Sequence, residues 1–303
     1  MVTIGKGKSL ASKGAVVFVL AILTIPIIHW IIFWFGVNIN SILMAFQLPT
    51  GDWSLETLKT VFEEIVSNQS NKDINLNVAI RNTLIYFTKD LLMLPFHLII
   101  AYFFYKKLTG YRVFQVIFYL PSIISGVAFS TMFSSFIASS GPIGILLKNM
   151  GVNPVPQLLA NSDYATGTIL FYTIWIGWGG NMLLLGGALA RVPIEILESA
   201  RLDGIKPAQE LIYMILPLIW STLSTLLILN MTSLFLADGP ILLFTSGKFQ
   251  TATIGYWIFD KVYYQGIGAY NSVAAAGLIF TLVGAPIILF LKYLIERVPV
   301  VEY

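Results

Sequence analysis

Residues 164–190 read YATGTILFYTIWIGWGGNMLLLGGALA and contain no charged side chain over 27 positions. An α-helix rises 1.5 Å per residue, so about 20 residues cross the roughly 30 Å hydrocarbon layer of a bilayer. This run is therefore long enough to cross a membrane as a single helix. It predicts an integral membrane protein.

Five other apolar runs of similar length lie along the chain. They cover residues 14–36, 82–105, 114–136, 211–235 and 271–291. Hydrophobic residues make up 57% of the chain and charged residues 11%, whereas a soluble domain carries about 25% charged residues. The first run exceeds the about 7–15 residues of a signal peptide's apolar region, so we expect a retained anchor. The sequence predicts an all-α protein with about six transmembrane helices.

Lysine and arginine are distributed unevenly among the segments that join these runs. Segments on the side of the N-terminus hold 11 of them in 53 residues, and these segments are residues 1–13, 106–113, 191–210 and 292–303. The opposite segments hold 6 in 106 residues, and these are residues 37–81, 137–163 and 237–270. Positive charge accumulates on the cytoplasmic side of membrane proteins. We therefore expect both termini in the cytoplasm and an even number of spans.

The first outer segment contains a short amphipathic pattern of its own. Apolar side chains recur at helical spacing, at Leu55, Leu58, Phe62, Ile65 and Val66, with charged residues between them. This spacing predicts an amphipathic helix at the outer surface.

The cytoplasmic segment after residue 190 combines two helix signals with a break. Residues 191–217, called the coupling loop below, read RVPIEILESARLDGIKPAQELIYMILP. Pro193 and Pro207 suit first helical turns, and Gly204 suits the left-handed residue that ends a helix. We expect a short helix over residues 194–203, a sharp turn, and a second helix that runs rigidly into the fifth span.

The coupling loop resembles the EAA loop of permease subunits of ATP-binding-cassette (ABC) importers. The family's pattern has E-A-A, three residues, G, nine residues, I, one residue and L-P. It falls here on Glu198-Ser-Ala200, Gly204, Met214 and Leu216-Pro217, and Asp203 supplies the common Asp-Gly pair. The lead-in at residues 189–195, Leu-Ala-Arg-Val-Pro-Ile-Glu, resembles that of the carbohydrate-uptake branch.

Other stretches resemble the same family. Asn82-Thr-Leu resembles the start of its permease core, and residues 114–121 resemble the opening of the next span. Residues 245–253 resemble the T-x-G-G-P region of maltose-type permeases but carry Lys248 and Phe249 where the family often has Gly-Pro. The resemblance implies a permease core over residues 82–297, preceded over residues 1–81 by a cytoplasmic tail, a first span and an outer loop.

The resemblance also implies partners. ABC importers join two permease subunits, here expected to be different chains, to two cytoplasmic ATPases and an extracellular solute-binding protein. The chain lacks the G-x-x-x-x-G-K-[ST] pattern, so ATP and Mg²⁺ are expected on the ATPases and no cofactor or catalytic residue in this chain. The expected ATPase-coupling residues are Ile194, Leu197, Glu198, Ala200, Asp203, Gly204 and Pro217.

Polar and aromatic residues within the runs are candidates for a substrate path. They are Asp90, Trp175, Trp178, Asn181, Asn230 and Asp238. Aromatic faces with nearby amides suit sugar rings, but close helix packing at the neighbouring glycines explains the same pattern. For Asp90 and its neighbour Lys89, the alternative is that the span starts later and the pair lies at the outer interface, or that it neutralises a neighbouring helix. His97 on the same face is typical of a packing residue.

Composition excludes several other functions. Cysteine is absent and there are two histidines, which excludes thiol chemistry and disfavours a metal site. The net charge of +3 gives no reason to expect a nucleic-acid partner. An intramembrane enzyme would need a catalytic cluster at depth, and a secondary transporter would show inverted repeats. The sequence favours a bacterial plasma-membrane importer of a sugar or oligosaccharide. The alternatives are an ABC permease for a peptide, amino acid or ion and, less favoured, a secondary transporter.

Overall fold

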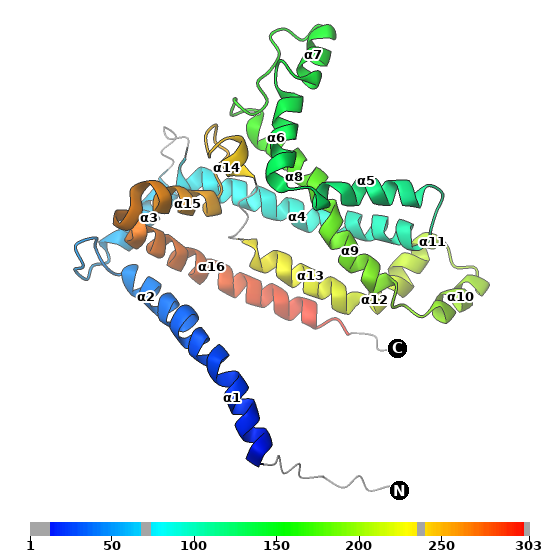
Figure 1. The fold of residues 1–303 in the computed structure, drawn as a ribbon, viewed down its shortest axis with the longest axis horizontal. Coiled ribbons are helices and arrows are strands. Elements are labelled where there is room, and N and C mark those ends of the chain that lie inside the picture. Colours follow the sequence, from blue (N-terminus) through cyan, green and yellow to red (C-terminus); the bar gives the residue numbers. More distant parts are fainter. Residues whose placement is uncertain (1–12, 68–73, 235–239, 300–303) are drawn as a thin grey trace.

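The computed structural model describes residues 13–67, 74–234 and 240–299, which fold into helices joined by short connections (Figure 1). The α-helices are α1 Lys13–His29, α2 Val37–Met44, α3 Glu56–Val66, α4 Leu76–Tyr105, α5 Tyr111–Ile123, α6 Gly126–Ile137, α7 Pro142–Asn149, α8 Ala165–Ile176, α9 Trp178–Leu189, α10 Ile194–Leu202, α11 Pro207–Gln209, α12 Leu216–Leu218, α13 Trp220–Thr232, α14 Ile241–Phe244, α15 Ile254–Gln265 and α16 Tyr270–Glu296. Two π-helical segments, η1 Trp30–Gly36 and η2 Glu210–Ile215, and the 3₁₀ segment η4 Gly266–Ala269 complete them.

The expected number of membrane spans is confirmed. Within the described residues, five helical stretches are long and apolar enough to cross a bilayer, namely Val16–Met44, Leu76–Tyr105, Gly126–Asn149, Ala165–Leu189 and Ile254–Glu296. A sixth is added if the bent pair Pro207–Leu218 and Trp220–Thr232 counts as one span. The protein is thus an all-α chain with five or six candidate spans.

The expected third span, residues 114–136, is not one helix. α5 ends at Ile123 and α6 begins at Gly126, because Ile124 takes an extended conformation with ψ of 145°. α6 rises steeply from the end of α5 in Figure 1. Hydropathy could not show this break, because the residues on both sides of it are apolar. The stretch long enough to cross a membrane here runs instead through α6 and α7.

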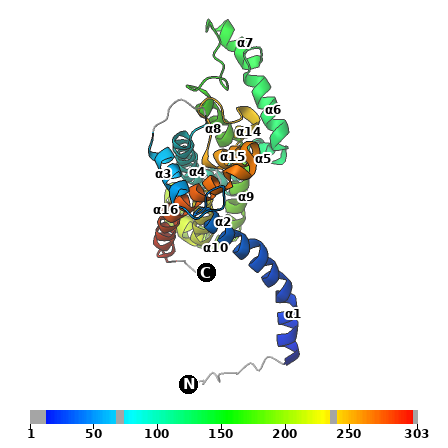
Figure 2. The ribbon, with the colours of Figure 1, turned by 90° about the vertical axis from the view of Figure 1, so that its left-hand side faces the viewer.

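The N-terminal helical stretch stands apart from the rest of the chain (Figure 2). Its most apolar 18-residue window has no buried residue. Its attachment lies at its α2 end, where the Asn271 side-chain amide donates to the carbonyls of Met44 and Gln47, each at 3.0 Å. This expected first span therefore exists, runs to Met44, and joins the other helices at one end.

The expected amphipathic helix is confirmed as α3, but its buried face differs from the expected one. Val61 is buried, and Leu58 and Ile65 pack with it against a core cluster built mainly from α4, α15 and α16. Leu55, Phe62 and Val66, which the pattern assigned to the apolar face, are exposed. Residues 58, 61 and 65 follow the narrower i, i+3, i+7 stripe, which is the one that meets α16.

The start of α4 holds the connection between α14 and α15. The Asn82 amide donates to the carbonyls of Gln250 and Ala252 at 2.7 and 2.9 Å, and the Ile254 amide donates to the Thr83 hydroxyl at 2.9 Å. Phe249 has a φ of +56°, which a proline at this position could not adopt. This loop therefore departs in backbone shape from a pattern with Gly-Pro at residues 248 and 249.

Thr83→Val is expected to lower the free energy of unfolding by about 1–3 kcal/mol, because the buried Ile254 amide loses its acceptor. Thr88→Val is a matched control on the same helix, since the exposed Thr88 hydroxyl donates only to the Leu84 carbonyl of its own turn. Thermal unfolding of both variants in detergent measures the difference. Equal stabilities would show that the loop does not depend on this contact.

The two ends of the molecule carry different features. α10 and the C-terminal end of α16 lie at one end, and α3 and α15 lie at the other (Figure 1). The even number of spans stays a prediction, since five or six stretches qualify. The assignment of the α10 end to the cytoplasm stays a prediction from the lysine and arginine distribution.

Candidate functional site

The coupling loop forms a helix, a turn and a second helix, as its sequence predicts. α10 ends at Leu202, the Ile205 amide donates to the Ala200 carbonyl at 3.3 Å, and Gly204 has a φ of +79°. This six-to-one hydrogen bond across a left-handed glycine is the usual end of a helix. Pro207 then opens α11 at its first position. The turn therefore needs the conformational freedom of glycine at residue 204.

α10 presents one face to its own chain and another to the outside. Leu197 is fully buried and packs in a cluster with Leu98, Leu189 and Ile215, and Ala200 is also buried. Leu197 and Ala200, both expected ATPase-coupling residues, are thus covered by their own chain in this arrangement, and their part in coupling stays a prediction. Exposed positions lie on the opposite side, at Ile194, Glu195, Glu198, Ser199 and Leu202, with Leu202 90% exposed.

The second helix of the coupling loop does not continue straight into the fifth span. Residues 207–218 meet α13 at 77°, and the bend falls at Ile219, whose φ and ψ are −97° and 6°. Pro217 lies in α12, two residues before the bend. The expectation that the second helix runs on unbroken into the fifth span is therefore wrong. Asp203 lies exposed at the end of α10, and its amide donates to the Ser199 carbonyl at 3.2 Å.

A buried ion pair beside the coupling loop was not predicted. The Lys106 ammonium lies 2.6 and 2.7 Å from the two carboxylate oxygens of Glu210. The Lys106 side chain is 17% exposed and that of Glu210 is 2% exposed. The two residues are 104 positions apart, and no local pattern in a sequence links residues at that separation.

Several path candidates come together between α4 and α9. The Asn181 amide lies 3.3 Å from the His97 ring nitrogen, and the Trp178 ring packs edge-on against that imidazole at 5.0 Å. Trp178 also packs against Phe118 at 5.1 Å. His97 is therefore a packing residue, as its type and position indicate. Trp178 is held between two rings.

The two charged residues on α4 form an ion pair with each other. Lys89 and Asp90 lie near the middle of this helix with ammonium and carboxylate 2.5 Å apart. α4 begins at Leu76, six residues before the expected start of the second span, so the pair does not lie at the end of its helix. The side chain of Asp90 remains 42% exposed. The two charges thus neutralise each other while leaving the carboxylate accessible.

The remaining path candidates lie elsewhere. Trp175 packs at 5.0 Å against Phe129, in an aromatic group with Phe133 and Tyr172, and is 38% exposed. Asn230 lies on α13, and its buried amide nitrogen has no hydrogen-bond partner among the residues that the structure describes. Asp238 lies outside the described residues. The structure therefore groups Trp178 with Asn181 and separates both from Trp175.

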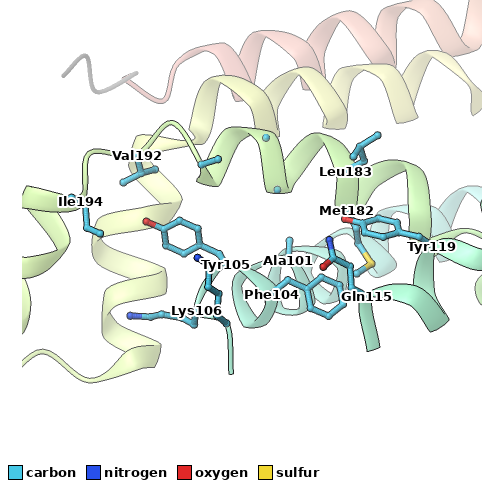
Figure 3. Close-up of a pocket in the computed structure, with 14 residues that line it drawn as sticks. Ala101, Phe104, Tyr105, Lys106, Gln115, Tyr119, Met182, Leu183, Val192 and Ile194 are labelled. Atoms are coloured by element: carbon cyan, nitrogen blue, oxygen red, sulfur yellow. The ribbon is translucent and has the colours of Figure 1, made fainter. Parts of the chain in front are cut away.

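A cavity of about 740 Å³ opens between the end of α4, α5, α9 and the start of the coupling loop (Figure 3). Its lining includes apolar side chains such as Phe104, Met182 and Val192. Its polar members are Tyr105, Lys106, Lys107, Gln115 and Tyr119. Ligand pockets commonly measure about 300–1,000 Å³. The cavity thus adjoins both α9, which carries Trp178 and Asn181, and the coupling loop.

Comparison with known proteins places this architecture in a family. The model of the family described as binding-protein-dependent transport system inner membrane component matches residues 78–299. The chain belongs to this family. It is therefore a multi-pass inner-membrane permease subunit of an ABC importer, a class of subunit distinct from the ATPases. The matched residues begin within α4 and end after α16, close to the permease core expected from the sequence.

Individual relatives agree with the family. The probable ABC transporter permease protein MG188 of Mycoplasma genitalium is 29% identical over 280 residues, which cover 86% of this permease and 78% of that protein. The maltose/maltodextrin transport system permease protein MalF of Salmonella typhimurium is 30% identical over 205 residues, 62% of this permease and 39% of MalF. A chain in the crystal structure of a bacterial ABC transporter involved in the import of the acidic polysaccharide alginate is 25% identical with a TM-score of 0.78, covering 93% and 96% of the two chains.

Proposed function

We propose that this permease imports a sugar or oligosaccharide that an extracellular solute-binding protein delivers, with ATP hydrolysis by two cytoplasmic ATPases driving alternating access. A second permease subunit, encoded as a different chain, completes the path. ATP and Mg²⁺ bind to the ATPases. The observation that carries the proposal is the placement of α10, a short helix anchored by Leu197 on one side and exposed at Glu198 and Leu202 on the other.

The exposed side of α10 suits a contact with a soluble partner. Ile194 and Leu202 offer apolar surface, and the Glu198 carboxylate can accept charge-assisted hydrogen bonds from basic or amide groups. The buried side ties the helix to α4, α9 and α13 through a shared cluster. A force on α10 is therefore applied to helices that cross the membrane, which an ATP-driven transporter needs because energy crosses between sites only through physical contacts.

The sugar assignment rests on relatives and on side-chain chemistry. MalF is named for maltose and maltodextrin, and the structural relative for alginate, an acidic polysaccharide. Trp175 offers a partly exposed aromatic face of the kind that carbohydrate rings stack on. A peptide, amino acid or ion as solute is the alternative within the same family, and a secondary transporter has no use for the exposed α10.

Purification of the tagged permease from its native membrane tests the proposal. The expected result is a complex that contains subunits with a Walker A sequence and a second permease, and that takes up labelled oligosaccharide into proteoliposomes only with ATP and the solute-binding protein. Competition with unlabelled sugars, peptides and amino acids then identifies the solute class. Uptake without ATP by the permease alone would contradict the proposal, and competition by peptides alone would overturn the sugar assignment.

Trp175→Ala is expected to slow uptake by roughly fivefold, on the order of 1 kcal/mol, because an exposed aromatic face leaves the path. ATP hydrolysis by the complex without solute should not change. Trp178→Ala is the comparison, since this ring is packed between His97 and Phe118 and should lower thermal stability more than uptake per folded complex. The reverse pattern in the two variants would assign substrate contact to Trp178.

A further inference from the structure

The Lys106–Glu210 pair joins the end of α4 to the coupling loop. Lys106 follows the last residue of α4, and Glu210 is the first residue of η2 in the coupling loop. Both carboxylate oxygens lie within 2.7 Å of the ammonium. Figure 3 shows the Lys106 side chain reaching from the end of α4 across to the neighbouring helix. The contact is therefore bidentate and enclosed.

Neighbouring groups reinforce the contact. The Lys106 ammonium lies 5.4 Å from the centre of the Tyr102 ring, and the Tyr102 hydroxyl donates to the Pro207 carbonyl at 3.3 Å. Tyr102 and Lys106 are four residues apart and thus share one face of the end of α4. Pro207 and Glu210 belong to the segment directly after the Gly204 turn. Two residues of α4 therefore hold two residues of the coupling loop.

A buried ion pair contributes little net stability, because desolvation offsets its attraction, and an apolar pair of similar volume often serves as well. The bidentate contact adds one defined position to the apolar packing of Leu197 and Ile215 against Leu98 of α4.

The bend at Ile219 shows why such a contact matters. A push on α10 is not directed along the axis of α13, since residues 207–218 meet that helix at 77°. The coupling loop also contacts α4, through Leu197 beside Leu98 and through the Lys106–Glu210 pair, and α4 packs along α9. Displacement of the coupling loop is thereby delivered to the helices that hold Trp178 and Asn181.

We propose that the Lys106–Glu210 pair is a latch that makes the coupling loop and α4 move as one body, and that Glu210 is a positioning residue for energy coupling. This role rests on the proposed function, because it concerns the step between ATP hydrolysis and import. Breaking the latch leaves docking of the ATPases on α10 intact and lets the loop move without α4.

The test compares Lys106→Met/Glu210→Leu with Lys292→Met/Glu296→Leu. The second pair is exposed, lies at the same end of the molecule and has its charges 3.7 Å apart. The latch variant should retain its ATPases and hydrolyse ATP, while solute imported per ATP falls roughly tenfold. The control should stay within about twofold of wild type, since exposed ion pairs contribute little. The swapped variant Lys106→Glu/Glu210→Lys should recover part of the solute imported per ATP hydrolysed.

A distance measurement tests, without a transport assay, whether the coupling loop and α4 move as one body. The chain lacks cysteine, so spin labels can be placed at Tyr213→Cys in the coupling loop and Leu108→Cys just after α4, both exposed. The wild-type distance should be narrow and equal with and without ATP, and the latch variant should show a broadened or shifted distance, also in the permease alone. A wild-type distance that changes with ATP, or a latch variant with wild-type distance and coupling, would overturn the latch. Failure of wild-type import would instead overturn the proposed function, while this distance still reports on the pair.

Discussion

Gly204→Val is expected to abolish import while the permease remains inserted at its normal level. Residue 204 has a φ of +79°, and a β-branched side chain in the left-handed region costs about 1–2 kcal/mol. A Cβ at this position meets nothing within 4 Å, so the effect comes from the backbone and not from a clash. We expect the backbone of the turn to change conformation to relieve this strain. That change would tilt α10 away from the position in which the ATPases bind it.

Two matched variants isolate this effect. Gly51→Val places the same side chain at an outer turn with φ of +92° and open space, and it should leave import unchanged. Gly204→Asn should retain import, because asparagine tolerates the left-handed conformation better than other non-glycine residues. ATPase retention and uptake are measured on each purified complex. Import by Gly204→Val at the wild-type rate would contradict the assignment of this turn.

Glu198→Arg is expected to reduce retention of the ATPases by roughly tenfold or more. The carboxylate lies exposed on α10 next to the anchored face, so reversal of its charge removes a charge-assisted hydrogen bond and adds a repulsion. The fold of the permease should not change, because Glu198 does not belong to the core. The readout is the amount of ATPase that co-purifies with the permease as salt concentration rises.

Glu296→Arg is the control for this variant, since Glu296 is exposed at the same end of the molecule. It should leave the ATPases bound. Equal retention in the Glu198 and Glu296 variants would mean that the partner docks elsewhere, and the face formed by Ile194, Glu198 and Leu202 would lose its proposed role.

The sequence is most informative where a property is local. Apolar length predicts membrane spans, since it depends only on composition over about 20 residues. The Gly204 turn and the start of α11 at Pro207 are equally local, because they follow from backbone preferences of single residues. The Gly204 turn and the start of α11 are found where the sequence puts them, and the number of spans agrees, although the third span is shifted to Gly126–Asn149.

Properties that depend on distant residues could not be predicted. The burial of Leu197 follows from Leu98 and Ile215, which lie far from it in the chain, so the pattern in α10 alone could not show which side faces a partner. The Lys106–Glu210 pair joins residues 104 positions apart. The bends at Ile124 and Ile219 lie within apolar runs, so the hydropathy of the sequence does not reveal them.

The central claim is that a nucleotide-hydrolysing partner docks on the exposed face of α10. The absence of cysteine allows a single photocrosslinker at Leu202→Cys, whose side chain is 90% exposed in the permease alone. The control is a separate variant of the same chain with the crosslinker at Trp53→Cys, a residue exposed in the outer segment. Crosslinking in native membranes followed by mass spectrometry should join residue 202, but not residue 53, to a subunit that carries a Walker A sequence. An intact importing complex in which residue 202 crosslinks only to lipid or water would contradict the claim.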